Sequence, residues 1–232
     1  MRVWLLTCLL CLVPLMPAGA QLNSENVPDG MSAVVAEGRA ALIAGDRARA
    51  LRLLRPEAEA GDSIAENLLG AIHDDGLGLP RDVLEARRWY ERSALQGNVQ
   101  GQMNLGMLLR DGGPGLAVDG EGARRWLQAS ADGGYGPAFA ALGRLHEDGI
   151  GGAQDLEQAA ALYAQGRAAG DPWASEYLGH LYREGRGVPE DLAQARALFT
   201  EAASAGLGQS MNNLAYMMEH GFEEVYHLQG GI

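Results

Sequence analysis

The sequence contains no lysine, so all 18 of its basic residues are arginines. This absence excludes three kinds of site that depend on a lysine amine: the phosphate-binding P-loop, a Schiff-base lysine and the Ser-x-x-Lys nucleophile pair. The 30 acidic residues outnumber the arginines and give a formal net charge of −12. An acidic chain with no basic stripe is a poor binder of nucleic acid.

Cysteine occurs only at Cys8 and Cys11, within a segment that has the features of a secretory signal peptide. A positive start precedes an apolar run at 3–16, and the small residues Ala18-Gly19-Ala20 form a cleavage site. The run is too short for a membrane anchor, because a bilayer-spanning helix needs about 20 residues. We therefore expect cleavage near Ala20 and export to a periplasm, or secretion, of a chain without disulfides.

The rest of the sequence contains an internal repeat. A Leu-Gly pair, replaced once by Leu-Ala, recurs at spacings of 36, 37, 36 and 36 residues. A small residue stands four positions before each leucine, and a glycine stands nine positions before the second residue of each pair. The pairs are Leu69-Gly70, Leu105-Gly106, Leu142-Gly143, Leu178-Gly179 and Leu214-Ala215. Agreement at three positions in five copies indicates one repeated structural unit.

Each repeat is predicted to form two antiparallel helices, which we name helix A and helix B in chain order. The Leu-Gly pair lies on helix A, where spacings of three and four residues place the small and apolar positions on one face. A Gly-x-Gly turn such as 185–187 follows; since it recurs with the same neighbours, it indicates a helix connection rather than a phosphate loop. Helix B then begins at a capping aspartate: Asp82, Asp119, Asp155 or Asp191. The predicted fold is all-α, a right-handed α/α solenoid of helix hairpins with one continuous core from about Met31.

The expected organisation follows from this register. It comprises a signal peptide at 1–20, a flexible lead at 21–30, a degenerate first helix pair at 31–62, four repeats at 63–98, 99–135, 136–171 and 172–207, and an incomplete fifth repeat with a C-terminal tail at 208–232. Pro56 is expected to bend or break the second helix of the degenerate pair. In the second repeat, Gly122 stands where the other repeats have Glu or Gln, so its helix B is expected to begin less firmly.

The fourth repeat reads Ala-x3-Leu-Gly-x2-Tyr-x2-Gly-x-Gly-Val-x2-Asp from Ala174 to Asp191 and continues to Leu198-Phe199. This pattern resembles the Sel1-like repeat, a relative of the tetratricopeptide repeat, and the resemblance extends from Ile64 to about Gly221. It implies an adaptor scaffold that holds other proteins, and exported bacterial members are similar to regulators and assembly factors at the cell envelope. A cysteine-rich Helicobacter branch, in which a disulfide pins each repeat, is linked to β-lactam binding or hydrolysis.

The resemblance also implies a ligand-binding groove lined by helix A. In the tetratricopeptide relatives the contacts come from positions two residues before the leucine, two after it and five after it. Here these positions, with Trp173 at the groove edge, predict protein-binding residues Asn67, Met103, Met107, Arg110, Arg144, Trp173, Glu176, His180, Arg183, Asn212 and Tyr216. The same positions also hold Ala71, Asp74, Ala140, Glu147 and Glu219. Such a mixture of Met, Arg, Asn and aromatic side chains suits an adaptable protein-binding surface.

No catalytic residue, metal or cofactor is predicted. His73 and His146 occupy the helix-A slot of Tyr182 and lie two repeats apart, too far to share an ion, whereas His220 and His227 are less constrained. Acidic pairs such as Glu190-Asp191 recur at loop edges, where capping and solubility explain them. We therefore expect a non-enzymatic scaffold that binds another envelope protein through the helix-A groove.

Two other functions remain open from the sequence. One is an enzyme or binder of β-lactam or cell-wall-related small molecules. The other is a structural protein that self-assembles through residues 208–232, because no helix B follows the fifth helix A. Its apolar residues would then be covered by the tail or by a partner, unless the chain is a truncated product: Met211, Leu214, Met217, Met218, Phe222 and Tyr226.

Overall fold

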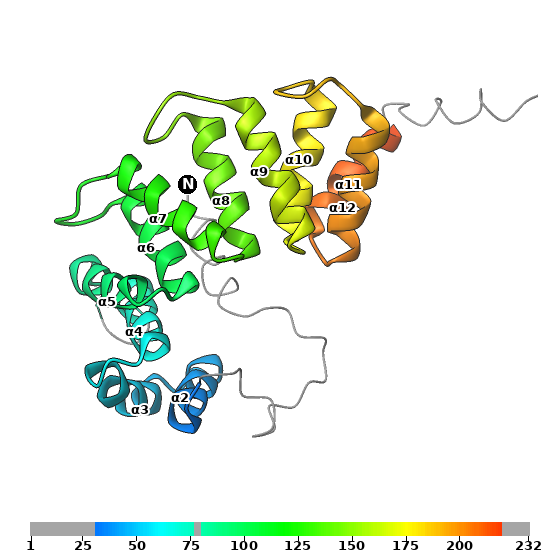
Figure 1. The fold of residues 1–232 in the computed structure, drawn as a ribbon. Coiled ribbons are helices and arrows are strands. Elements are labelled where there is room, and N and C mark those ends of the chain that lie inside the picture. The colour runs from blue at the N-terminus through cyan, green and yellow to red at the C-terminus, as the bar shows by residue number, and fades with distance from the viewer. Residues whose placement is uncertain (1–30, 77–79, 220–232) are drawn as a thin grey trace, which may run out of the picture. The chain divides into compact units, whose positions relative to one another are not determined.

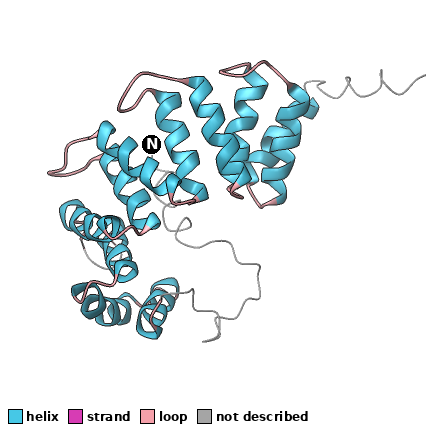
Figure 2. Ribbon diagram, viewed as in Figure 1, coloured by secondary structure: helices cyan, strands magenta, loops and turns pink. Residues whose placement is uncertain are grey.

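The computed structural model describes residues 31–76 and 80–219, which form helices joined by turns (Figures 1 and 2). Within these ranges the structure has no strand, which confirms the predicted all-helical fold. The predicted signal peptide (1–20), the lead (21–30) and the last 13 residues, 220–232, lie outside the described residues. No helix in the described part of the chain is long and apolar enough to cross a membrane.

The chain divides into two compact units, unit 1 (1–118) and unit 2 (119–232). Unit 1 contains α2 (Ala33–Ile43), α3 (Arg47–Glu59), α4 (Ser63–Asp75), α5 (Val83–Leu95) and α6 (Val99–Asp111). Unit 2 contains α7 (Gly120–Asp132), α8 (Gly136–Asp148), α9 (Leu156–Ala168), α10 (Pro172–Glu184), α11 (Leu192–Ser204) and α12 (Gly208–Glu219). Within each unit every helix packs on the next one in the chain (Figure 1). Helices α4, α6, α8, α10 and α12 are the helices A, and α5, α7, α9 and α11 are the helices B.

The boundary between the two units falls after Val118, and whether the core is continuous across it stays a prediction. It lies in the turn of the second repeat, which is one residue longer than the other turns. Gly113 and Leu116 exchange two backbone hydrogen bonds of 2.9 Å, and Leu116 is buried. Gly113 lies so close to Val83 of α5 that an added Cβ would be 2.9 Å from its side chain. The turn is therefore closed onto unit 1 before the next helix starts.

The capping aspartates start the helices B as predicted. The carboxylates of Asp82, Asp119, Asp155 and Asp191 each accept a hydrogen bond from the backbone N–H three residues later, at 2.8–3.0 Å. The cap of α7 reaches the N–H of Gly122 at 2.8 Å. The glycine at this position therefore does not prevent the cap bond from forming.

The glycine turns adopt backbone conformations that glycine favours. Gly185 ends α10 with φ of 63° and Gly187 follows with φ of 68°, a conformation that side chains disfavour. At Gly187 an added Cβ would also lie 2.4 Å from the backbone carbonyl of Leu156. The turn can therefore rest directly on the start of the preceding helix B, α9.

Within a hairpin, the glycine of the Leu-Gly pair receives an aromatic ring from helix B. An added Cβ would be 2.5 Å from the Tyr163 ring at Gly143 and 2.8 Å from the Phe199 ring at Gly179. Unit 1 repeats this arrangement with Gly70 and the Tyr90 ring. Tyr163 and Phe199 are completely buried, so this contact brings the two helices close together and forms the centre of each hairpin core.

Pro56 does not break α3, which runs without interruption from Arg47 to Glu59. The proline removes the hydrogen bond of its own missing backbone N–H, and the rest of the helix stays in place. Ala50, Leu54 and Ala58, spaced by four residues, form a buried face that holds the helix in place. Of the two expected effects of Pro56, a break is therefore wrong and a bend stays a prediction.

Candidate functional site

The first of the three predicted groove positions is not on the surface. Asn67 is 1% exposed, Met103 8% and Glu176 1%, which corrects the expectation that this position faces a groove. The cause is packing against the following helix A: Asn67 of α4 bonds Asn104 of α6, and Glu176 of α10 bonds Ser210 and Asn213 of α12. Among the predicted residues at this position, only Asn212 is exposed, because it lies on the last helix A that the structure describes.

In unit 1 the remaining predicted residues are Met107 and Arg110, and both are half-buried. The Arg110 guanidinium forms two hydrogen bonds with the adjacent Asp111 carboxylate, at 2.6 and 2.8 Å. The Arg110 charge is thus paired within its own helix.

In unit 2 the predicted residues Arg144 and Trp173 meet at Tyr177, which the sequence did not single out. The Arg144 guanidinium lies over the Tyr177 ring, 5.3 Å from its centroid. The Trp173 and Tyr163 ring centroids lie 6.1 and 5.4 Å from that of Tyr177. Burial raises the pKa of the Tyr177 hydroxyl, so the phenol stays protonated. This arrangement fixes Arg144 in a cation–π contact between α8 and α10.

Glu147 ties the same region to the turn after α10. One of its carboxylate oxygens accepts a 2.7 Å hydrogen bond from the Tyr163 hydroxyl, and the other lies 3.0 Å from Arg186. Burial, followed by the contact with Glu147, raises the pKa of Tyr163. Arg186 had been interpreted only as part of a glycine turn. The sequence did contain a signal for its pairing with Glu147, because Arg186 is a large charged residue between two glycines.

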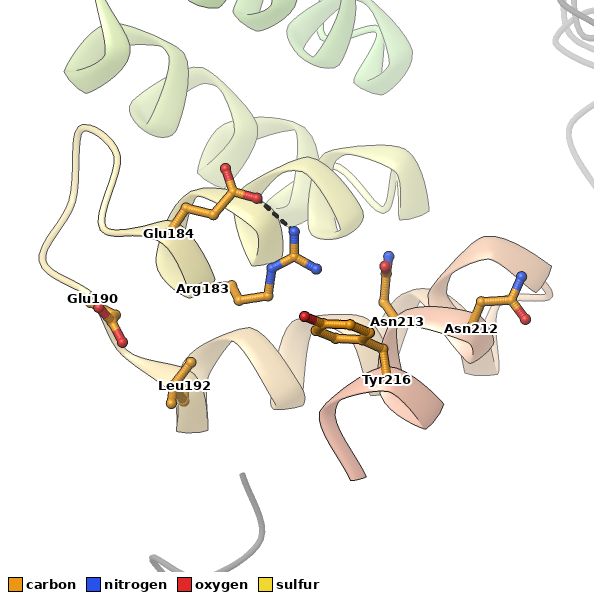
Figure 3. Close-up of a pocket in the computed structure, with 7 residues that line it drawn as sticks. All are labelled: Arg183, Glu184, Glu190, Leu192, Asn212, Asn213 and Tyr216. Atoms are coloured by element: carbon orange, nitrogen blue, oxygen red, sulfur yellow. Dashed lines mark hydrogen bonds and ion pairs between the residues drawn. The ribbon is translucent and has the colours of Figure 1, made fainter. Parts of the chain in front are cut away.

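A second group of predicted residues lines an open hollow of about 480 Å³ between α10, the start of α11 and α12 (Figure 3). Arg183, Asn212 and Tyr216 were predicted to bind a partner. Glu184, Glu190, Leu192 and Asn213 complete the lining. In Figure 3 the Arg183 side chain extends along the hollow above the Tyr216 ring, while its guanidinium pairs with Glu184 at 2.6 Å. We define the helix-A face of unit 2 as Arg144, Trp173, Tyr177, Arg183, Asn212 and Tyr216.

His180 and Glu176, the remaining predicted residues, form a polar contact between α10 and α12. The buried Glu176 carboxylate accepts hydrogen bonds from the Ser210 hydroxyl and, at 3.1 Å, from the Asn213 amide. His180 Nε2 lies 3.6 Å from the same carboxylate, and its ring meets the Phe199 ring edge-on at 5.1 Å. A serine, a histidine and a glutamate thus come together, but the serine bonds the glutamate rather than the histidine. This differs from the arrangement in which a histidine activates a serine.

The histidines show no shared site in the described part of the chain, where no group of three metal-ligating side chains occurs. The carbonyl oxygens of His73 and His146 each accept a 2.9 Å hydrogen bond from the capping aspartate of the next helix. Burial lowers the pKa of both imidazoles. His220 and His227 lie outside the described residues.

The comparisons with known proteins agree with this architecture. The Sel1 repeat model matches residues 63–98, 99–135, 138–171, 174–207 and 208–227. The chain therefore belongs to the Sel1 repeat family, whose helical repeats form scaffolds.

Solved structures of the same family resemble the chain. A Sel1 repeat protein from Oxalobacter formigenes is 27% identical over 79% of this chain and 75% of its own, with a TM-score of 0.66. The protective antigen c5321 of uropathogenic Escherichia coli, which displays an SLR fold, is 26% identical over 75% of this chain, with a TM-score of 0.52. This chain covers 45% of that antigen's length. A putative Sel1 repeat protein from Klebsiella pneumoniae shares the fold at 20% identity, over 80% of this chain and 91% of its own, with a TM-score of 0.56. None of the curated proteins compared with the chain matches it.

Proposed function

We propose that the chain is a non-enzymatic scaffold of the periplasm, or a secreted one, and that it binds another envelope protein through the helix-A face of unit 2. The observation that carries this proposal is the open hollow beside α12, lined by the half-exposed Tyr216, Asn212 and Arg183. Tyrosine and arginine are enriched at protein interfaces because they combine apolar area with hydrogen-bonding groups.

The geometry favours binding over catalysis. Two carboxylates beside the helix-A face of unit 2 are paired with arginines: Glu184 with Arg183 and Arg186, and Glu147 with Arg186. Interactions with the arginines lower the pKa of Glu184 against the opposing effect of its partial burial, which keeps it ionised. A general acid near neutral pH needs a raised pKa, and Glu184 has the opposite shift.

Site-specific photo-crosslinking tests the proposal. A photoreactive phenylalanine analogue at Tyr216 is expected to capture a defined protein in cells that export the chain, identified by mass spectrometry. The matched control is the same analogue at Ala197, an exposed position on α11. Arg144→Glu should weaken the captured complex while leaving the circular dichroism spectrum unchanged. Equal capture at both positions, or complexes insensitive to Arg144→Glu, would contradict a specific helix-A face.

Export is tested separately. The mass of the chain recovered from an osmotic-shock fraction should correspond to a start at Gln21. Recovery of the uncleaved chain from the cytosol would exclude a periplasmic or secreted partner.

A further inference from the structure

One side of α12 corresponds to the side of the other helices A that a helix B covers. On α10 the hydroxyl of Ser175 bonds Glu201 of α11 at 2.8 Å, and Gly179 receives the Phe199 ring. The corresponding residues of α12 are Met211 and Ala215, and within the described residues both are exposed. We name Met211, Leu214, Ala215 and Met218 the α12 stripe.

The α12 stripe is apolar and lies on one side of the helix. Met211 and Met218 are 54% and 52% exposed, and Leu214 is half-buried between them. The spacings of three, one and three residues place all four on one helical face. Met217 holds the helix on the flank next to Leu214: it is buried with Phe199 and Ala195 of α11, and Leu214 packs partly against this cluster. The helix is therefore firmly attached through one side and open on the other.

Ala215 makes another aromatic helix B a poor occupant of the α12 stripe. At Gly143 and Gly179 an added Cβ would lie only 2.5 and 2.8 Å from the aromatic ring of helix B. Real Cβ atoms do not approach a ring atom so closely, so the methyl group of Ala215 would collide with a ring seated in the same way. The occupant must present a small or flexible side chain at this point.

A second copy of the same helix satisfies this requirement. The α12 stripe is nearly symmetric about the point between Leu214 and Ala215, because methionines stand three residues outside each of them. An antiparallel pair of α12 helices related by a twofold axis would place Met211 opposite Met218 of the second copy. Leu214 would then face Ala215, a large residue against a small one, which permits close packing.

Charge favours the same occupant. The chain has a net charge of −12, so two copies repel one another over most of their surface. In α12, however, the one acidic residue is Glu219 at the last position and Tyr216 is the one other ionisable residue, whereas α10 contains Glu176, Arg183 and Glu184. The α12 stripe is thus a place where two copies can meet without opposing like charges.

We propose that two copies of this chain associate through antiparallel packing of their α12 stripes. A contact between single helices falls at the low end of interface sizes, below about 1,200 Å² in total. The association should therefore be weak, reversible and dependent on concentration. It uses a different side of α12 from Asn212 and Tyr216, so a captured envelope protein and a second copy need not compete.

Cysteine cross-linking tests the pairing and its direction in the full chain with Cys8 and Cys11 replaced by serine. Met211→Cys and Met218→Cys chains, mixed and oxidised, should give a disulfide-linked pair, whereas each chain alone should not. In the antiparallel pair two copies of residue 211 are offset by about 10 Å along the axis, beyond the roughly 4.4–6.8 Å between Cα atoms that a disulfide permits. Leu84→Cys mixed with Leu95→Cys, both exposed on α5, controls for random collision.

Sedimentation provides the second measurement. The double variant Met211→Glu, Met218→Glu should weaken the dimer at least tenfold, while Leu95→Glu leaves its dissociation constant unchanged. Efficient cross-linking of each single-cysteine chain with itself overturns the proposal, because it indicates parallel pairing. Absence of cross-links in the mixture also overturns it. Cross-linking that appears only after removal of residues 220–232 does so too, since that segment would then cover the α12 stripe in the full chain.

Discussion

Asn213 of α12 donates a hydrogen bond from its side-chain amide to the buried carboxylate of Glu176 in α10, with 3.1 Å between the two atoms. Unit 1 contains the same hydrogen bond at the corresponding repeat positions. There the side-chain amide of Asn104 in α6 donates to Asn67 in α4 at 2.8 Å. In both units a polar side chain thus joins one helix A to the next. A buried polar group needs such a partner, because leaving it unpaired costs free energy.

Asn213→Ala should therefore lower the free energy of unfolding by about 1–3 kcal/mol, because it removes a donor from a buried acceptor. The neighbouring Asn212 is exposed, so Asn212→Ala should change it by less than about 0.5 kcal/mol. Urea denaturation of the two variants beside the wild type measures both effects. Equal effects at both positions would contradict the structural role given to Asn213.

Gly179→Ala tests the close approach of α10 and α11. An added methyl would meet the Phe199 ring, so overpacking should destabilise the protein by about 1–3 kcal/mol. Gly208 provides the matched control, because no atom lies within 4 Å of a Cβ added there and its backbone suits other residues. Gly208→Ala is expected to be neutral or slightly stabilising in thermal denaturation. A Gly179→Ala protein as stable as the wild type would show that the two helices can separate without cost.

Arg124 of α7 holds the next glycine turn through three backbone carbonyls, those of Ile150 at 2.6 Å, Leu145 at 3.1 Å and Ala153 at 3.1 Å. Arg124→Ala should speed amide hydrogen exchange in residues 149–154 and destabilise the protein by about 2 kcal/mol, since hydrogen bonds to charged groups are stronger than average. The adjacent Arg125 is exposed, and Arg125→Ala should leave exchange in this turn unchanged. The same exchange rates in both variants would disprove the role of Arg124.

The sequence predicted the helices well because their signals are local. A capping aspartate, a glycine turn and a Leu-Gly pair recur in each copy, so each repeat supports the interpretation of the others. Pro56 was misjudged because the buried face of its helix outweighs one lost hydrogen bond. The close contact of the longer second turn with Val83 of α5 is a feature of the packing that a one-residue insertion does not reveal.

The candidate site was predicted less completely, because a position within a repeat does not determine exposure. Glu176 and Asn212 occupy the same position, yet the first is buried and the second is exposed, since only the first is covered by a following helix A. Tyr177 was missed because it stands beside the recurring leucine, Leu178, rather than at a predicted groove position. Its contact with Arg144 depends on the packing of α8 against α10, a feature of three-dimensional structure.

Asp171, the N-cap of α10, should make the stability depend on pH. It is 6% exposed; one carboxylate oxygen accepts from the N–H of Trp173 at 3.3 Å, and the other has no partner within the described part of the chain. Burial raises the pKa of this carboxyl from 3.8 to about 6. The folded protein therefore binds this proton more tightly than the unfolded chain does, so Asp171 favours folding more strongly as the pH falls from about 6 towards 4.

Asp171→Asn keeps a good N-cap but removes the buried charge. At pH 7.5 it should raise the free energy of unfolding by on the order of 2 kcal/mol, from the size of the pKa shift. This advantage should shrink as the pH is lowered through 6 and become small near 4, where the folded wild-type carboxyl is protonated and the unfolded one is about half protonated. Asp155→Asn, at the exposed N-cap of α9, is the control and should change the stability far less. Urea titrations at pH 4.5, 6 and 7.5 measure the free energy of unfolding of each variant. A stability difference for Asp171→Asn that stays constant with pH would show that the buried carboxyl does not titrate in this range.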